Sequence, residues 1–274
     1  MPETSDTCLL QRDENEFRRI NRQHRLWTRT LDYLIHPAID ATLPKDSKIA
    51  DVATGTGIWA LATARALTES VTLVGFDNCK NQFPHPDSIP KNVSFEAQNL
   101  LKPFPIHHQG AFDLVSIRLV ASALKKEEWE LAARNLFSLL KPGGYIQWME
   151  ADISESCTPL QNTPQACSHS LASLAKYALS FLHSKGTDPS GCRRLLEIFR
   201  CMGLEDCTQD VFSSDRDPSL RAEFSDVHAR ALLGILEQAG LQMWSGWNLE
   251  KVREWERRVV AELETGRVPG IIEK

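Results

Sequence analysis

The sequence predicts an α/β protein in which helices cover both faces of a largely parallel sheet. First, the short apolar rise Lys48-Ile49-Ala50 leads through a Gly-rich loop into a segment of helical spacing that begins at Ile58. Second, strand-like and helix-like patterns alternate from Pro44 to Glu150. Third, the residues after Glu150 read mainly as successive helices, so we expect the sheet in the first part of the chain.

Residues 1–14 are predicted to be a disordered N-terminus. An amphipathic helix, or two short ones, is expected from Asn15 to about Ile35, because apolar residues recur every three or four positions. His24 and Trp27 belong to this apolar stripe. His24 is either a core histidine or a histidine above a ligand pocket. We predict that residues 15–44 form a helical lid ahead of the sheet.

The parallel sheet is expected to contain strands near residues 48–53, 71–77, 92–98, 111–117 and 144–150, with helices at 58–68 and 125–140. Lys141-Pro142-Gly143-Gly144 would end the second helix, because proline and glycine stop helices. The Pro-rich residues 83–86 predict a short turn in place of a long helix.

Beyond Glu150, three helices are predicted to begin with a capping residue and a proline, at Thr163-Pro164, Asp188-Pro189 and Asp217-Pro218. They would run to about His183, Met202 and Gln238. A strand is expected over Glu205 to Ser213. A final helix is expected over Leu249 to Leu263, and Gly266 would end it. The residues of this helix expected to face inward are Leu249, Val252, Trp255, Val259 and Leu263. Residues 15–274 therefore read as one domain, with the core over 45–151 and helical, substrate-side elements with a sixth strand over 152–274.

The loop from Asp51 to Gly57 has the form of a nucleotide-binding turn, because Gly55 and Gly57 can adopt positive φ beside the free N–H groups of a new helix. Gly55-x-Gly57-x-x-Ala60, followed by Asp77, also matches a dinucleotide fingerprint, so NAD is one candidate ligand. The Asp51 carboxylate would repel a pyrophosphate and attract an ammonium or sulfonium group. Charge therefore favours S-adenosylmethionine over NAD, and a turn without a ligand is the third interpretation.

Composition narrows the possible partners. The chain has 274 residues, is 42% hydrophobic and carries a net charge of −5, which provides no general attraction to nucleic acid or to an anionic membrane. The start is polar and acidic, and no apolar run approaches the roughly 20 residues of a membrane span, so a cytoplasmic protein is expected. The seven cysteines contain no Cys-x-x-Cys pair and are expected to be free thiols, without a metal site.

The chain resembles the class I S-adenosylmethionine-dependent methyltransferases over residues 15–150, and more weakly beyond. The resemblance rests on the Asp51–Gly57 loop, Gly75-Phe76-Asp77, Gln98-Asn99, Phe112-Asp113-Leu114-Val115 and Leu140-Lys141-Pro142-Gly143-Gly144-Tyr145. Arg22-Gln23-His24 with Leu26-Trp27, and residues 53–59, are similar to the fungal secondary-metabolism methyltransferases that act on small natural products. The resemblance implies a Rossmann-like fold and methyl transfer from S-adenosylmethionine to O, N or S of a small acceptor.

The resemblance also implies a set of cofactor-binding residues, namely Asp51, Ala53, Gly55, Gly57, Asp77, Asn78, Asn99, Leu100 and Arg118. Asp77 would accept hydrogen bonds from the ribose hydroxyls, and Asp51 would help to hold the ammonium group. Asn99 and Leu100 would border the adenine, Gly55 and Gly57 would lie under the methionine part, and Arg118 would line the mouth of the pocket.

Two departures from the family pattern leave other functions open. Ala53 stands at the first glycine position of the family loop. In addition, little sequence remains after Gly266 for a last strand. A missing last strand would leave an exposed sheet edge and could favour a homodimer. A methyltransferase fold without methyl transfer, such as a cofactor-assisted cyclase or an interaction partner, is the alternative.

Methyl transfer to a hydroxyl or amide benefits from a general base but needs no covalent enzyme intermediate. His24 is the predicted catalytic base, and Glu150, His107 and His108 are further candidates. Trp148, Met149, Trp244 and Trp247 could form the walls of an apolar substrate pocket, although aromatic residues at such positions are usually core.

Overall fold

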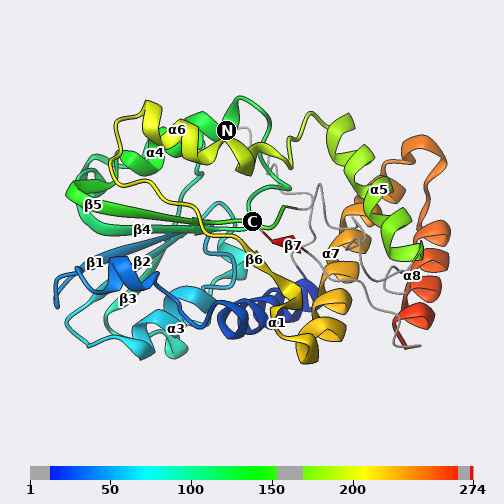
Figure 1. Ribbon diagram of the computed structural model, residues 1–274, viewed down its shortest axis with the longest axis horizontal. Coiled ribbons are helices and arrows are strands. Elements are labelled where there is room, and N and C mark those ends of the chain that lie inside the picture. The colour runs from blue at the N-terminus through cyan, green and yellow to red at the C-terminus, as the bar shows by residue number, and fades with distance from the viewer. Residues whose placement is uncertain (1–12, 153–168, 265–271, 274) are drawn as a thin grey trace.

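A parallel five-stranded sheet in the order β3-β2-β1-β4-β5 forms the centre of the protein (Figure 1). The computed structural model describes residues 13–152, 169–264 and 272–273. The strands are β1 (Lys48–Val52), β2 (Thr72–Asp77), β3 (Val93–Ala97), β4 (Phe112–Arg118) and β5 (Leu140–Met149). The predicted α/β fold with a parallel sheet is confirmed.

Helices cover both faces of the sheet (Figure 1). One face packs against α3 (Ile58–Ala66) through a cluster that contains Ile49, Trp59 and Leu73. The other face packs against α4 (Glu128–Phe137) and α6 (Leu195–Cys201) through residues that include Ala50, Trp129 and Leu136. Because neighbouring residues of β1 enter opposite clusters, both faces of the sheet are buried, as the long apolar strands require.

The carboxyl ends of β4 and β5 are covered by α1 (Glu14–Leu31) and α7 (Arg221–Leu241), whose apolar residues join one cluster with Leu119 and Met149. An ion pair of 2.6 Å between Nη1 of Arg22 and Oδ2 of Asp226 links the two helices. The short helix α2 (Pro37–Asp40) leads from α1 to β1. Thus the helix predicted as a lid does lie over the end of the sheet where ligands of open α/β sheets bind.

Helix α7 also belongs to a second core at one end of the molecule, formed with α5 (His169–Ser184) and α8 (Leu249–Glu264) (Figure 1). Trp247 and Trp255 are buried in this core. Trp244 packs against it, and neither Trp244 nor Trp247 lines the two cavities described below, in line with the alternative that these aromatic residues belong to the core. Leu249, expected to face inward, is 41% exposed at the first turn of α8.

The described elements differ from the sequence expectations in several places. β5 begins at Leu140, because the turn at residues 141–144 lies inside the strand. The register with β4 shifts there: Phe112 pairs with Leu140, but Leu114 pairs with Tyr145. α4 correspondingly ends at Phe137. The chain after Asp188-Pro189 forms a 3-10 turn (Gly191–Arg194) before α6, whereas Asp217 caps the 3-10 turn Pro218–Leu220 that leads into α7. Short 3-10 turns at Lys80–Gln82 and Pro86–Ser88 replace a helix after β2, as predicted.

The strand expected over residues 205–213 is mostly wrong. Only β6 (Phe212–Ser213) forms, and it pairs antiparallel with β7 (Ile272–Glu273) in a separate two-stranded sheet. Within the described residues, no strand pairs with the outer edge of β5.

The predictions for residues 1–12, for the helix start at Thr163 and for Gly266 fall on residues outside the described ranges, whereas Asp13 already caps α1. None of the helices in the described part of the chain combines the length and apolar character that a bilayer crossing requires.

Candidate functional site

The Gly-rich loop between β1 and α3 has a left-handed backbone at alternate residues, with φ of 55° at Ala53, 54° at Gly55 and 71° at Gly57. A Cβ on Gly57 would lie 2.6 Å from the ring of Phe95, so packing as well as φ requires glycine there. A Cβ on Gly55 would meet nothing closer than 3.8 Å. The loop surface at Gly55 is therefore open enough for a ligand to approach the backbone.

Asp77, at the end of β2, is joined directly to this loop. Its Oδ2 accepts a hydrogen bond of 2.9 Å from the backbone N–H of Gly55, and its Oδ1 accepts one of 2.9 Å from the N–H of Cys79. The carboxylate is 7% exposed. The structure thus brings together the two features that the dinucleotide and methyltransferase interpretations both require, a glycine loop and an acidic residue on the next strand.

A buried acidic residue, Asp51, and the half-buried Arg118 lie beneath the loop. Oδ2 of Asp51 accepts a hydrogen bond of 2.5 Å from the Thr54 hydroxyl, and burial raises the pKa of Asp51 to about 6 although the nearby charge of Arg118 opposes this shift. Burial likewise lowers the pKa of Arg118 to about 10, against the effect of Asp51. The ionised forms of both residues therefore depend on each other.

His24, the predicted base, faces the same arginine. Its Nδ1 lies 3.3 Å from Nη1 of Arg118, and the Arg118 guanidinium lies 5.9 Å from the centre of the Trp59 ring. Burial, together with the charges of Arg118 and Arg25 that act in the same direction, lowers the pKa of His24 to about 4. His24 is therefore neutral near pH 7, and Nδ1 can accept the hydrogen bond from Arg118.

The residues expected near an adenine lie at the carboxyl end of β3. Oδ1 of Asn99 accepts a hydrogen bond from the Leu101 N–H at 2.8 Å, and the carbonyl of Leu100 accepts one from Nδ2 of Asn135 at 2.7 Å. Asn99 and Leu100 are half-buried, whereas Asn78, directly after Asp77, is exposed. The second contact fixes the loop after β3 to α4, and the N–H of Gln98 donates a hydrogen bond of 2.9 Å to the carbonyl of Asp77 at the end of β2.

Glu150, directly after β5, is a second buried acidic residue. It accepts hydrogen bonds from the N–H of Val120 at 2.8 Å, the N–H of Ala121 at 3.2 Å and Nε1 of Trp148 at 2.9 Å. These donors favour the ionised form, but burial outweighs them and raises the pKa of Glu150 to about 7. The carboxyl group can therefore gain and lose a proton near neutral pH.

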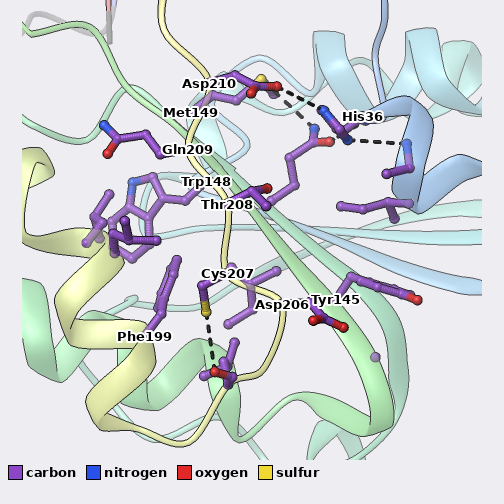
Figure 2. Close-up of a pocket in the computed structure, with 18 of the residues that line it drawn as sticks. His36, Tyr145, Trp148, Met149, Phe199, Asp206, Cys207, Thr208, Gln209 and Asp210 are labelled. Carbon is purple, nitrogen blue, oxygen red and sulfur yellow. Dashed lines mark hydrogen bonds and ion pairs between the residues drawn. The ribbon is translucent and has the colours of Figure 1, made fainter.

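Glu150 lines two cavities. A groove of about 940 Å³ follows the outer edge of β5, between that strand, α6 and residues 203–212. Figure 2 shows Trp148 beside Phe199 on one side of this groove, and Asp210 paired with His36, whose Nε2 lies 3.0 Å from Oδ2 of Asp210. Trp148 and Met149 line the groove, in agreement with their predicted place at a pocket wall.

The second cavity, of about 100 Å³, lies between α1, α7 and the carboxyl ends of β4 and β5. Trp27 and Glu150 line both cavities. The walls of the smaller one are mostly apolar and include Leu119, Phe224, Val227, Leu232 and Ile235.

His228 on α7 also lines the small cavity, and sequence reasoning missed it. Burial lowers its pKa to about 4, with the charge of Arg19 acting in the same direction, and its Nε2 has no hydrogen-bond partner among the described residues. The one available signal was its place beside Phe224 and Leu232 on a helical stripe.

Comparison with known proteins agrees with this geometry. Residues 49–144, which contain β1 to β4 and the start of β5, match the family model described as "Methyltransferase domain". The segment is a methyltransferase domain.

The methyltransferase domain has fungal relatives. The chain is 40% identical over 157 residues to methyltransferase grgD of a Penicillium species. The aligned residues cover 55% of this chain and 54% of that protein. It is 37% identical over 153 residues to N-methyltransferase sirN of Leptosphaeria maculans, covering 56% and 52% of the two chains. Thus the chain spans about half the length of the curated relatives that it matches.

Solved structures show the same fold as the methyltransferase domain. A Haemonchus contortus phosphoethanolamine N-methyltransferase aligns with a TM-score of 0.51 at 13% identity, covering 92% of this chain and 51% of that one. The [4+2]-cyclase SpnF aligns with a TM-score of 0.50 at 19% identity, covering 92% and 79%.

Proposed function

We propose that this protein binds S-adenosylmethionine at the Gly55 loop and transfers its methyl group to a nitrogen, oxygen or sulfur atom of a small acceptor. The hydrogen bond from the Gly55 N–H to Asp77 carries this proposal, because it places the loop and the acidic residue at one point of the sheet's carboxyl edge. Nitrogen is the acceptor atom that we favour, since sirN is an N-methyltransferase.

Charge supports a cationic cofactor over NAD. Asp51 and Asp77 contribute two carboxylates near the loop, whereas the interactions described for Asp51 include one cation, Arg118. A pyrophosphate would meet a local excess of negative charge there, but a sulfonium with an ammonium group would be attracted. We propose that Asp77 accepts hydrogen bonds from the ribose, because its carboxylate lies at the end of β2 and contacts the Gly55 loop.

Bound S-adenosylmethionine would supply an electrophilic methyl group, and the protein would supply position and exclusion of water. In this proposal α1 and α7 cover the reacting end of the sheet, and Trp27 of α1 forms part of the wall of the small cavity. The acceptor's reactive group would lie in the small cavity, with the remainder of a larger acceptor in the groove along β5, since Glu150 and Trp27 line both.

Glu150 is the better of the two candidate bases. A base is most effective when its pKa lies near the operating pH, and the pKa of Glu150 is about 7 whereas that of His24 is about 4. The role of His24 as a base stays a prediction. The Arg118 contact supports a positioning role for His24, in which the neutral ring fixes the guanidinium that faces Asp51.

Calorimetric titration with S-adenosylhomocysteine, S-adenosylmethionine and NAD tests the cofactor assignment. We expect the first two to bind and NAD not to bind. Incubation with methyl-labelled S-adenosylmethionine and a panel of small apolar amines, phenols and thiols tests transfer. Binding without transfer to any of them would favour the non-transferring alternative, and NAD binding alone would overturn the proposal.

A further inference from the structure

A cluster of metal-ligating side chains lies outside the site described above. Glu96 on β3 and the adjacent His107 and His108 of the 3-10 turn Ile106–His108 each offer one ligand atom, and these atoms lie within 4.8 Å of one another. None of the three residues lines either cavity. Within the described ranges this is the single group of three or more His, Cys, Asp or Glu residues with such spacing.

His108 is held rigidly in the cluster. It is 4% exposed, and its ring meets the ring of Phe76 edge-on, with centroids 5.0 Å apart, and packs near Phe112 at 5.8 Å. Its Nε2 lies 2.9 Å from Oε2 of Glu96. Glu96 in turn pairs with Phe76 in the parallel register of β2 and β3, so both ligands are fixed by the same piece of sheet.

The remaining ligand atoms are accessible. The Glu96 side chain is 43% exposed, and His107 is exposed with its ring centroid 4.1 Å from that of His108. Nδ1 of His108 has no hydrogen-bond partner among the described residues. An ionised Glu96 carboxylate can only accept a hydrogen bond, so without a metal ion Nε2 of His108 carries the ring proton. A metal ion that takes the Nε2 lone pair would shift this proton to Nδ1, which has no competing donor among the described residues.

We propose that Glu96, His107 and His108 bind a divalent transition-metal ion of the zinc class. Two imidazoles and one carboxylate form a donor set typical of zinc sites that keep an open fourth position, and the nitrogen donors disfavour Mg²⁺ and Ca²⁺. The ion would join the 106–108 turn to β3 beside Phe76, whose neighbour in the chain is Asp77. Metal binding would therefore stabilise this edge of the sheet, independently of any methyl transfer.

Zinc titration of the tag-free, full-length protein by calorimetry tests this site. We expect one Zn²⁺ per chain, and we expect His107→Ala and Glu96→Gln each to weaken binding at least about 10-fold, since even outer-shell partners change metal affinity by about 10- to 100-fold. Zn²⁺ should also raise the melting temperature of the wild-type protein but not that of His107→Ala. Both variants alter exposed side chains, so melting without metal checks that they fold.

His85→Ala is the matched control, because His85 is an exposed histidine whose Nδ1 lies 3.5 Å from Oδ2 of Asp87 but which belongs to no three-ligand group. It should bind Zn²⁺ as the wild type does. Free thiols could compete with the proposed site for the metal ion; those of the described residues are Cys79, Cys192, Cys201 and Cys207. The Co²⁺ complex of the protein tests this, because its absorption should lack a thiolate charge-transfer band if the metal ion is bound by Glu96, His107 and His108. Unchanged affinity in His107→Ala, the absence of stoichiometric binding, or a thiolate band would overturn the proposal.

Discussion

Nη1 of Arg118 and Nδ1 of His24 lie 3.3 Å apart and connect the end of β4 to helix α1. The contact joins residues that are 94 positions apart in the chain. Because the guanidinium can only donate hydrogen bonds, the histidine must be unprotonated to accept one. The covering helix is thus tied to the charged centre beneath the Gly-rich loop through a neutral ring.

Arg118→Met should destabilise the protein by about 3 to 5 kcal/mol at pH 7, because removal of one partner leaves a buried charge without its counter-charge. Burial raises the pKa of Asp51 and the charge of Arg118 opposes that rise, so Asp51 is the buried group that would lose its counter-charge. Adding Asp51→Asn should recover much of the stability, and urea unfolding of the four proteins of this cycle measures the coupling. Additive effects of the two changes would show that these residues do not interact.

Asp77→Asn should weaken binding of S-adenosylhomocysteine by about 10- to 100-fold, because hydrogen bonds to a charged acceptor contribute about 1.5 to 3 kcal/mol each. Asp87→Asn, on an exposed turn, is the control and should leave affinity unchanged. Calorimetry on both variants gives the comparison. Equal affinity in the two folded variants would remove Asp77 from the cofactor site.

Glu150→Gln should change how stability depends on pH. The folded-state pKa of about 7 lies above the ordinary value of 4.5, so the stability that protonated Glu150 contributes is complete below pH 4.5 and is lost as pH rises through 7. The free energy of unfolding of wild type minus variant should therefore fall by about 3 kcal/mol between pH 4.5 and 8. Lost hydrogen bonds add only a constant offset.

His24 and His228 give the opposite slope in both proteins, because their lowered pKa values add stability above pH 6.5 that is lost as pH falls towards 4. Their contributions cancel in the difference between the two proteins. Urea unfolding across this pH range measures the difference. A difference that stays flat with pH would mean that Glu150 titrates normally.

Ala53→Gly should leave the protein as stable or make it more stable by up to about 1 kcal/mol, because a left-handed backbone costs a non-glycine residue about 1 to 2 kcal/mol and glycine adds unfolded-state entropy. Ala53 has φ of 55°. Ala62→Gly, inside α3, should instead cost about 1 kcal/mol. Opposite signs for the two variants in urea unfolding are the expected result, and equal losses would contradict it.

Local patterns were sufficient for the sheet and its loop but not for contacts between distant elements. β1, β2 and β4 follow apolar runs closely, and Gly55 meets Asp77 because parallel neighbouring strands end together. Residues 205–211 were misread because a strand needs a partner, which a local pattern does not reveal.

The site residues that were missed depend on tertiary placement. His228 reaches its cavity through the packing of α7 on α1, and Glu96 meets His108 through the position of the turn before β4. Neither juxtaposition has a spacing signature in the chain, and cysteine spacing alone suggested no metal site.

The outer edge of β5 also bears on how the protein behaves in concentrated solution. Among the described residues no strand covers this edge, so backbone N–H groups on that side should exchange with deuterium faster than those that face β4. Such an edge can pair with another extended chain. Lys141 and Pro142 near its start oppose that association, one by charge and the other because proline has no N–H to donate.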